Sequence, residues 1–313
     1  MSLSVLEVTG LASVQGAPRR GSRHLGVPWS GPADALSLAL GNRLLGNEET
    51  APGIEVAMGA MTLRSAAAVA VAITGAAGAV RLDGTEAEAH RVLILPAQGT
   101  LAVTPGRVGA RFYVSVAGGL DIAPVLGSPS TYAPAGLGGH EGRALRAGDR
   151  LALAAPGVRP EACVPSGYRP PLTGSVVLRA VPGPEFAKLA PAARTALFAA
   201  PFVVTPRADR MGLRLRGPDL AAPDADPGMA SVGVLPGTVQ LPPGGEPILL
   251  GPDGQTTGGY PRIATVIAAD LHLAGQLRPG DGVRFYPRTP SQALSDTRGK
   301  ARLFAPFAGT GWL

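Results

Sequence analysis

The densest group of hydrogen-bonding side chains in the sequence lies between residues 254 and 261, directly after an apolar run. It contains Gln255, Thr256, Thr257 and Tyr260, with glycines among them. A glutamine side chain offers both a hydrogen-bond donor and an acceptor, so it can recognise an amide. Glycine lets the backbone approach a ligand closely, and backbone N–H groups in such a loop can bind an oxyanion. A polar hairpin turn explains the same residues equally well at this level.

A second group combines opposite charges. Asp209 and Arg210 are adjacent and follow a strand-like run, so they could bind a carboxylate or position a base. Exposed ion pairs contribute little to stability, and a surface turn with solvated charges is a slightly better local explanation.

A third group surrounds the start of a predicted helix. His24 lies in a glycine-rich, basic loop, and Ser30 and Asp34 flank the helix start. The free N–H groups at a helix start can bind an anion. Plain helix capping, with His24 bonded to the backbone, explains these residues better on local grounds.

The helix itself is predicted from about residue 32. Pro32 suits a first turn, leucines recur every four residues from 36 to 44, and Gly46 and Asn47 supply a left-handed stop. Two further short helices are predicted at 191–199 and 268–276. The remaining pattern is strand-like, with short apolar runs close to glycine or proline at 69–73, 92–95, 111–116, 151–153, 176–181, 202–205, 247–250 and 283–286.

The composition supports this picture. The 313 residues include 44 glycines and 32 prolines, scattered without a period. Such a chain is typical of many short strands joined by tight turns, which excludes a coiled coil, a helical bundle and collagen. We therefore expect an all-β protein with a few short helices. Two halves are predicted, residues 1–155 and 175–313, joined by a Pro/Gly-rich linker at 156–174. A weak repeat, L-R-x-G-D at 145–149 and 277–281, supports two related all-β halves.

Charge and residue usage exclude several function classes. The net charge is +6, but the arginines are dispersed and aromatic residues make up only 4%, unlike the clustered basic face of a nucleic-acid binder. No apolar stretch reaches the roughly 18 residues of a membrane span. The four histidines are too widely separated for a metal site. A single cysteine, Cys163, and the absence of a signal-peptide pattern favour a cytoplasmic location.

Common enzyme signatures are absent as well. The glycine-rich stretch 251–259 has no lysine and is therefore not an ATP-binding phosphate loop. The stretch 57–61 has glycine where a biotin-carrying lysine would stand. We therefore expect this chain to be one piece of an assembly.

A series of ordered motifs resembles one known family. They read R-H-L-G-V-P-x-S-G at 23–31, I-E-V at 54–56, T-G-A at 74–76, V-A-G-G-L-D at 116–121, V-L-G-S at 125–128, G-L-G-G-x-E-G-R-A-L at 136–145, D-R-M-G-L-R-L at 209–215, V-x-P-G-x-x-Q-x-P-P at 234–243 and Q-T-T-G-G-Y-P at 255–261. On these motifs the sequence resembles the family of the C subunit of 5-oxoprolinase, also called the allophanate hydrolase subunit 2 or carboxyltransferase subdomain A family. That family includes the antagonist of a kinase inhibitor in bacilli.

The resemblance implies two tandem cyclophilin-like β-barrel domains. It also implies one part of an ATP-dependent 5-oxoprolinase, inactive alone, that opens 5-oxoproline to glutamate with A and B subunits, of which B binds it directly. ATP would act in the assembled enzyme. Taken with the polar groups above, the resemblance makes five residues catalytic candidates: Gln255, Thr256, Thr257, Tyr260 and Asp209. It makes seven others candidates for substrate binding: His24, Ser30, Asp34, Arg210, Gln240, Gly258 and Gly259.

The chain departs from the family pattern at four positions, one of which is Ala208 in place of a serine. Gly16, Val232 and Gly254 stand where the family commonly has aspartate, glutamate and histidine. Because such groups can do acid–base work, two alternatives stay open. One is a non-catalytic regulator that binds a kinase inhibitor resembling the B subunit. The other is the carboxyltransferase part of a biotin-dependent urea or amide carboxylase, with biotin carried by another chain.

Overall fold

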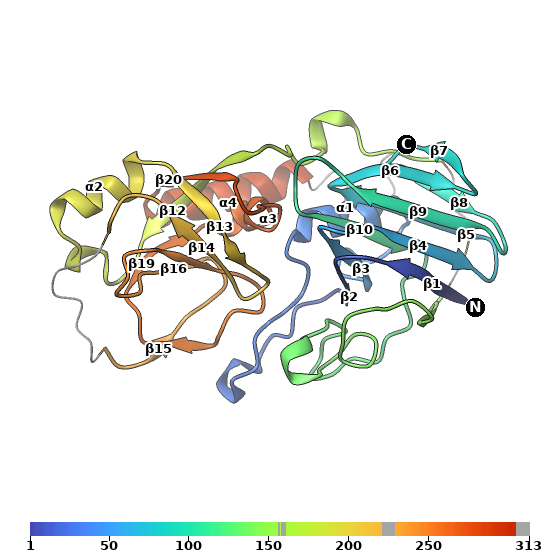
Figure 1. Cartoon of the computed structure of the whole chain (residues 1–313), viewed down its shortest axis with the longest axis horizontal. Coiled ribbons are helices and arrows are strands. Elements are labelled where there is room, and N and C mark those ends of the chain that lie inside the picture. The colour runs from blue at the N-terminus through green and yellow to red at the C-terminus, as the bar shows by residue number, and fades with distance from the viewer. Residues whose placement is uncertain (156, 158–160, 221–228, 305–313) are drawn as a thin grey trace. The chain divides into compact units, whose positions relative to one another are not determined.

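The computed structural model describes residues 1–155, 157, 161–220 and 229–304 (Figure 1). Contacts divide the chain into two compact units. Unit 1 contains Met1–Arg20, Ser30–Leu172 and Phe304, and unit 2 contains Gly21–Trp29 and Thr173–Leu303. A short segment of the first half thus belongs to the second unit. The predicted linker at 156–174 includes residue 156 and residues 158–160, which lie outside the described residues, and its exact limits stay a prediction.

Unit 1 is built from two antiparallel sheets (Figure 1). The six-stranded sheet has the order β11 (Arg150–Ala152), β1 (Ser2–Val8), β4 (Met61–Ser65), β9 (Thr100–Pro105), β6 (Ala77–Leu82) and β7 (Thr85–Ala87). The five-stranded sheet has the order β2 (Leu11–Gln15), β3 (Gly53–Ala57), β10 (Arg111–Val116), β5 (Val69–Gly75) and β8 (Val92–Leu95). Alternate apolar residues of both sheets form one core.

The predicted first helix is confirmed as α1 (Ala35–Leu44), which packs on β5 and β10. Strands β5 and β10 are therefore buried along their whole length, with one face toward the core and the other toward the helix. The approach is close: a Cβ on Gly41 of α1 would lie 2.8 Å from the Ser115 hydroxyl of β10. Only glycine fits there without displacing the helix.

Unit 2 contains a closed barrel of seven strands. Around the ring these are β12 (Ser175–Pro182), β19 (Arg262–Val266), β16 (Thr238–Gln240), β17 (Ile248–Leu250), β14 (Gly212–Arg216), β13 (Phe202–Ala208) and β20 (Gly282–Pro287). Strands β12 and β20 pair in parallel. The two buried rings of Phe202 and Phe285 meet edge to face inside the barrel, with centroids 5.6 Å apart. A two-stranded ribbon, β15 (Val232–Gly233) with β18 (Thr257–Gly258), is separate from the ring.

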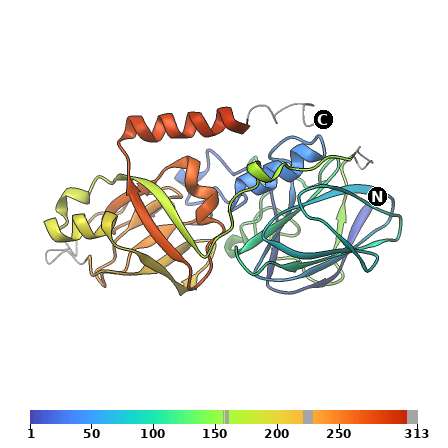
Figure 2. The same cartoon turned by 90° about the horizontal axis from the view of Figure 1, so that it is seen from above.

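Three helices accompany the barrel: α2 (Pro191–Ala199), α3 (Leu271–Ala274) and α4 (Pro290–Phe304) (Figure 2). Helix α2 matches the sequence prediction. The predicted helix at 268–276 is shorter, because a 3₁₀ turn (Ala268–Asp270) precedes α3. Helix α4, none of whose residues is buried, was not predicted from the sequence. Among the described residues, no helix is long and apolar enough to span a membrane.

The expectation of an all-β protein with a few short helices is confirmed. The expected pair of barrels is found only in part: unit 2 closes, whereas the described strands of unit 1 form two separate sheets. At one side of the two sheets the edge strand β7 has only three residues, and Val92 at the start of β8 bonds outside the sheets, with its N donating to Ala162 O at 2.8 Å.

Candidate functional site

Several predicted site residues line one pocket of unit 2, which has a volume of about 390 Å³. The pocket lies at the ends of β13, β14 and β17. Its lining residues are Pro206, Arg207, Ala208, Asp209, Met211, Gly212, Arg214, Ile248, Leu250, Gln255 and Tyr260. The structure therefore brings Asp209, Gln255 and Tyr260 together, although they come from stretches more than forty residues apart. A pocket of this size suits a small molecule.

The amide of Gln255 is oriented by a second glutamine. Its Nε2 donates to Oε1 of Gln240 at 2.7 Å, and Gln240 Nε2 in turn lies 3.4 Å from Tyr260 O. Gln240 is fully buried in β16, so its amide is a fixed support. This network turns Nε2 of Gln255 toward Gln240 and leaves Oε1 of Gln255 as the atom that can accept a hydrogen bond from a ligand.

The two glycines after the threonines serve packing. A Cβ on Gly258 would lie 2.6 Å from Gln240 Nε2, and one on Gly259 would lie 3.1 Å from Met229 O. Gly258 is therefore needed so that the backbone can pass over the buried Gln240 amide. Both glycines support the shape of the loop, and their expected contact with a ligand stays a prediction.

Asp209 and Arg210 are adjacent in the chain, but Asp209 closes a turn whereas Arg210 forms a buried ion pair. One oxygen of Asp209 accepts from the backbone N–H groups of Met211 (2.7 Å) and Gly212 (3.1 Å) and so closes a turn at the pocket rim. Arg210 is 8% exposed, and its Nε and Nη2 donate to the two oxygens of buried Asp253 at 2.7 and 3.2 Å. The guanidinium of Arg210 is thus directed at a partner inside the protein, which accounts for its charge without a substrate.

The glycine-rich stretch before Gln255 is bonded internally. The amide of Gly251 donates to Met211 O at 2.9 Å, that of Asp253 to Arg210 O at 3.0 Å, and that of Gly254 to Gly251 O at 3.1 Å. These three amides are therefore not available to cradle an anion, and the oxyanion role expected for the loop 254–261 stays a prediction for its remaining amides. At Gly254 a Cβ would approach Gly251 O and Met211 O at 3.0 Å. The backbone fills the space around this position.

The threonines shape the ribbon beside the pocket. Thr256 accepts a hydrogen bond at its carbonyl from Val234 N (3.1 Å), and Thr257 begins β18 with an exposed side chain. Neither lines the pocket, so their predicted catalytic role receives no support from its geometry.

A residue beside His24 contacts this loop. Arg23, in the 3₁₀ turn Arg23–Leu25, donates from Nη2 to Val234 O and to Gln255 O, the latter at 3.0 Å. The side chain of His24, by contrast, is exposed. Sequence reasoning selected His24 for its chemistry and missed Arg23, although both stand in the same motif.

Ser30 and Asp34 belong to unit 1, not to the unit that holds the pocket. Asp34 is fully buried and caps α1, with its two oxygens accepting from Ser37 N (2.9 Å) and Ser37 Oγ (2.6 Å). The backbone of Asp34 donates to the hydroxyl of Tyr113, which donates to Glu55 at 2.8 Å. Burial, reinforced by Glu55, raises the pKa of Tyr113 well above its usual value. The capping interpretation of Asp34 explains its position.

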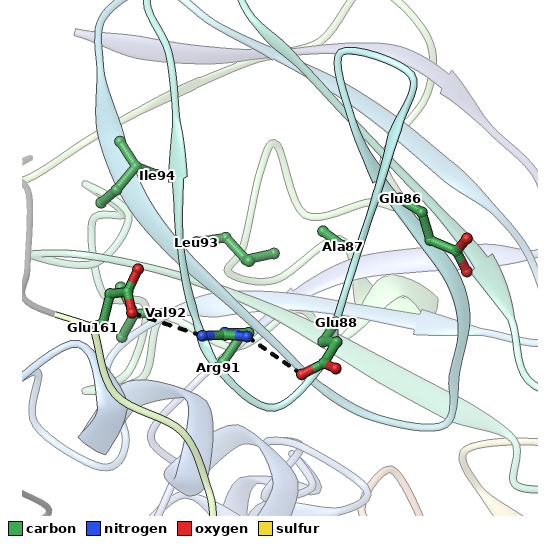
Figure 3. Close-up of a pocket in the computed structure, with 8 residues that line it drawn as sticks. All are labelled: Glu86, Ala87, Glu88, Arg91, Val92, Leu93, Ile94 and Glu161. Atoms are coloured by element: carbon green, nitrogen blue, oxygen red, sulfur yellow. Dashed lines mark hydrogen bonds and ion pairs between the residues drawn. The ribbon is translucent and has the colours of Figure 1, made fainter.

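Unit 1 has a larger pocket, of about 730 Å³, beside β7 and β8 (Figure 3). Arg91 lies between Glu88, at 3.3 Å, and Glu161, at 3.8 Å, while Glu86 points away from it (Figure 3). These carboxylates are largely exposed, and none of the predicted site residues lines this pocket. In the described part of the chain, no cluster of histidine, cysteine, aspartate and glutamate could hold a metal ion.

Comparison with known proteins identifies the family. The carboxyltransferase domain family, subdomain A and B, matches residues 25–287. The chain belongs to this family. It is similar to the C subunit of 5-oxoprolinase from Escherichia coli, with 35% identity over 306 residues, which cover 98% of this chain and 97% of that protein.

The relatives with solved structures have longer chains than this protein. The crystal structure of TTHA0988 is 38% identical with a TM-score of 0.81, over 91% of this chain and 55% of that one. The urea amidolyase of Kluyveromyces lactis is 27% identical with a TM-score of 0.90, over the whole of this chain and 20% of that one. The chain thus spans about half of the first structure and a fifth of the second.

Proposed function

We propose that this carboxyltransferase-family chain is the C subunit of a 5-oxoprolinase-type enzyme, which opens 5-oxoproline to glutamate together with A and B subunits. The proposal rests on the match to the E. coli relative, which covers 98% of this chain and 97% of that protein. A separate protein of the same extent therefore exists in a relative. The urea amidolyase, by contrast, contains the matching region as a fifth of a longer chain.

The pocket of unit 2 supplies groups suited to a lactam acid. Oε1 of Gln255 can accept the ring N–H, because the amide is held in that orientation by Gln240. Arg207 and Arg214 line the same pocket, and because Arg214 also lies 3.8 Å from Glu246, Arg207 is the stronger source of positive charge for the substrate carboxylate. Tyr260 also lines the pocket, and because this residue is 43% exposed, its side chain can change rotamer when a ligand binds. The role of this chain would be to bind and orient the amide.

ATP is assigned to another chain in this proposal. The amides of the glycine-rich stretch 251–254 are bonded within the protein, so they do not fit a phosphate group. ATP would supply the driving force for a ring opening that is uphill by itself. A chain acting with such partners on a metabolite is expected in the cytoplasm, and it would contact the B subunit directly. The relationship of its two units to the cyclophilin-like barrels of the family is part of the same proposal.

The test is 5-oxoproline-dependent release of ADP by purified chains. We expect turnover when this chain is combined with candidate A and B subunits, and none when any one of the three is left out. A matched reaction with 2-pyrrolidinone, which has the lactam but no carboxylate, should be much slower. Robust turnover by this chain alone, or none by a stable three-part complex, would contradict the proposal.

A second candidate function is the carboxyltransferase part of a biotin-dependent urea or amide carboxylase. It is favoured by the fit to the K. lactis urea amidolyase over the whole chain with a TM-score of 0.90. Biotin would then be carried by another chain. The test is transfer of a labelled carboxyl group from biotin carrier protein to urea, which should fail if the first proposal is right.

A non-catalytic role is favoured by the positions where family side chains are lost. A Cβ on Gly16 would lie 2.9 Å from both the Pro129 side chain and Thr50 O, so the space that the family aspartate would need is filled. In this case the chain would bind a kinase inhibitor that resembles the B subunit, without turnover. Complex formation with such a protein, together with no activity in any three-part mixture, would support this third candidate.

A further inference from the structure

Arg23 lies at the end of the β15–β18 ribbon. In this ribbon Val234 N donates to Thr256 O at 3.1 Å, just beyond the paired strands. Nη2 of Arg23 donates to the carbonyls of Val234 and Gln255, so one guanidinium joins both sides of the ribbon at the point where the loop leaves it. The contact also explains why residues 21–29 belong to unit 2 although residues on both sides of them belong to unit 1.

The charge of Arg23 is not balanced by a carboxylate in the described part of the chain. Arg262, which also contacts the ribbon through Gly233 O at 3.2 Å, is paired with Glu185 at 2.8 Å. Arg23 instead lies 5.5 Å from the centre of the Trp29 ring, and its buried Nη1 has no acceptor among the described residues. Burial accordingly lowers the pKa of this guanidinium. Because burying an unpaired charge is unfavourable, its placement is better explained by the carbonyls it holds than by a gain in stability.

We propose that Arg23 is the positioning residue for Gln255. Gln240 holds the side-chain amide of Gln255 from one side at 2.7 Å, and Arg23 holds its backbone carbonyl from the other at 3.0 Å. Together they fix the direction in which Oε1 of Gln255 faces the pocket. The inference rests on the proposed function only in taking Gln255 as the group that contacts the ligand.

Hydrogen exchange followed by mass spectrometry tests the structural part on the full-length chain. Arg23→Gln and Arg23→Lys are compared with the wild type, and Arg284→Gln serves as control because Arg284 is an exposed arginine of β20. In Arg23→Gln, exchange in residues 231–240 and 254–261 should be about 10- to 100-fold faster, as expected for losing hydrogen bonds from a charged donor. Arg23→Lys should show a smaller increase, since an ammonium is a point donor without the planar fork of guanidinium. The control should not change.

Equal exchange in the wild type and both Arg23 variants would overturn the proposal. If Arg23→Gln does not fold, Arg23→Lys alone decides it: faster exchange confined to these two segments supports it, and unchanged exchange overturns it. This result does not depend on enzymatic activity.

A double-mutant cycle in the assembled enzyme tests the functional part. Arg23→Gln should lower kcat/KM by about tenfold in the wild type but add nothing in a Gln255→Ala background, because Arg23 acts through the placement of the Gln255 side chain, which that background lacks. Additive losses would show that Arg23 acts apart from Gln255 and would overturn the proposal. An assembly without any turnover would refute the proposed function, while the exchange experiment would still decide the role of Arg23.

Discussion

Replacing Gln255 with alanine tests whether this residue binds the ligand or only stabilises the fold. The change removes the donor to Gln240 Oε1, and Gln240 is fully buried, so one acceptor of the core loses its partner. Such a loss costs about 1–3 kcal/mol when no water can replace the donor. Gln255 itself is only half-buried, so water can replace part of the lost donor. We therefore expect the free energy of unfolding to fall by about 1 kcal/mol, at the low end of that range.

The activity should fall by far more than this stability loss explains. Losing one or two hydrogen bonds that act in the transition state lowers kcat/KM by about 10- to 1,000-fold. The assay is urea unfolding of the chain and kcat/KM of the assembled enzyme, measured on the same preparation. Unchanged kinetics, or a kinetic loss no larger than the unfolded fraction, would refute the assignment of Gln255 to the site.

Gln255→Glu is the companion variant of matched size. An ionised carboxylate cannot donate to Gln240 Oε1, so two acceptors would face each other across the 2.7 Å contact. Protonation restores a donor, and the pKa of the new carboxyl should therefore be raised in the folded state. Relative to the wild type, this variant should gain stability as the pH falls through that pKa. A variant with no such pH dependence would show that the two glutamines do not interact as described.

Three further outcomes are expected. Asp253→Asn removes the charge of one partner of the buried Arg210 guanidinium, and we expect a loss of about 1.5–3 kcal/mol in chemical denaturation, as for hydrogen bonds to charged groups; unchanged unfolding would contradict the buried pair. The hydrogen bond from Arg143 lowers the pKa of Asp149 to about 2 from 3.8, so its contribution is present above about pH 4 and disappears as the pH falls toward 2. Asp149→Asn should remove that dependence from unfolding curves, and an unchanged pH profile would count against it. The chain should elute with a co-expressed B subunit as one complex in size-exclusion chromatography at micromolar concentration, and separate elution would argue against a direct contact.

Local sequence was sufficient for the features that depend on near neighbours. Helix α1 follows from the leucines every four residues and the stop at Gly46, because helical contacts join residues three or four apart; it begins at Ala35 with Asp34 as its cap, so Pro32 precedes the helix instead of lying in its first turn. The short strands and turns follow from scattered glycines and prolines for the same reason. Within the polar stretch 254–261, Gln255 and Tyr260 line a pocket and Thr257–Gly258 form a short strand, while the predicted site roles of the stretch stay predictions.

Tertiary structure decided what each polar side chain does, because its partner comes from a distant part of the chain. Arg210 is bound by Asp253, which is 43 residues away, and the carbonyl of Gln255 is bound by Arg23, which is 232 residues away. Nothing in a local pattern distinguishes an arginine that awaits a ligand from one that already has a buried partner. The same holds for sheet closure. In unit 1, Val92 at the start of β8 donates to Ala162, which is 70 residues away, and no local pattern predicts that pairing.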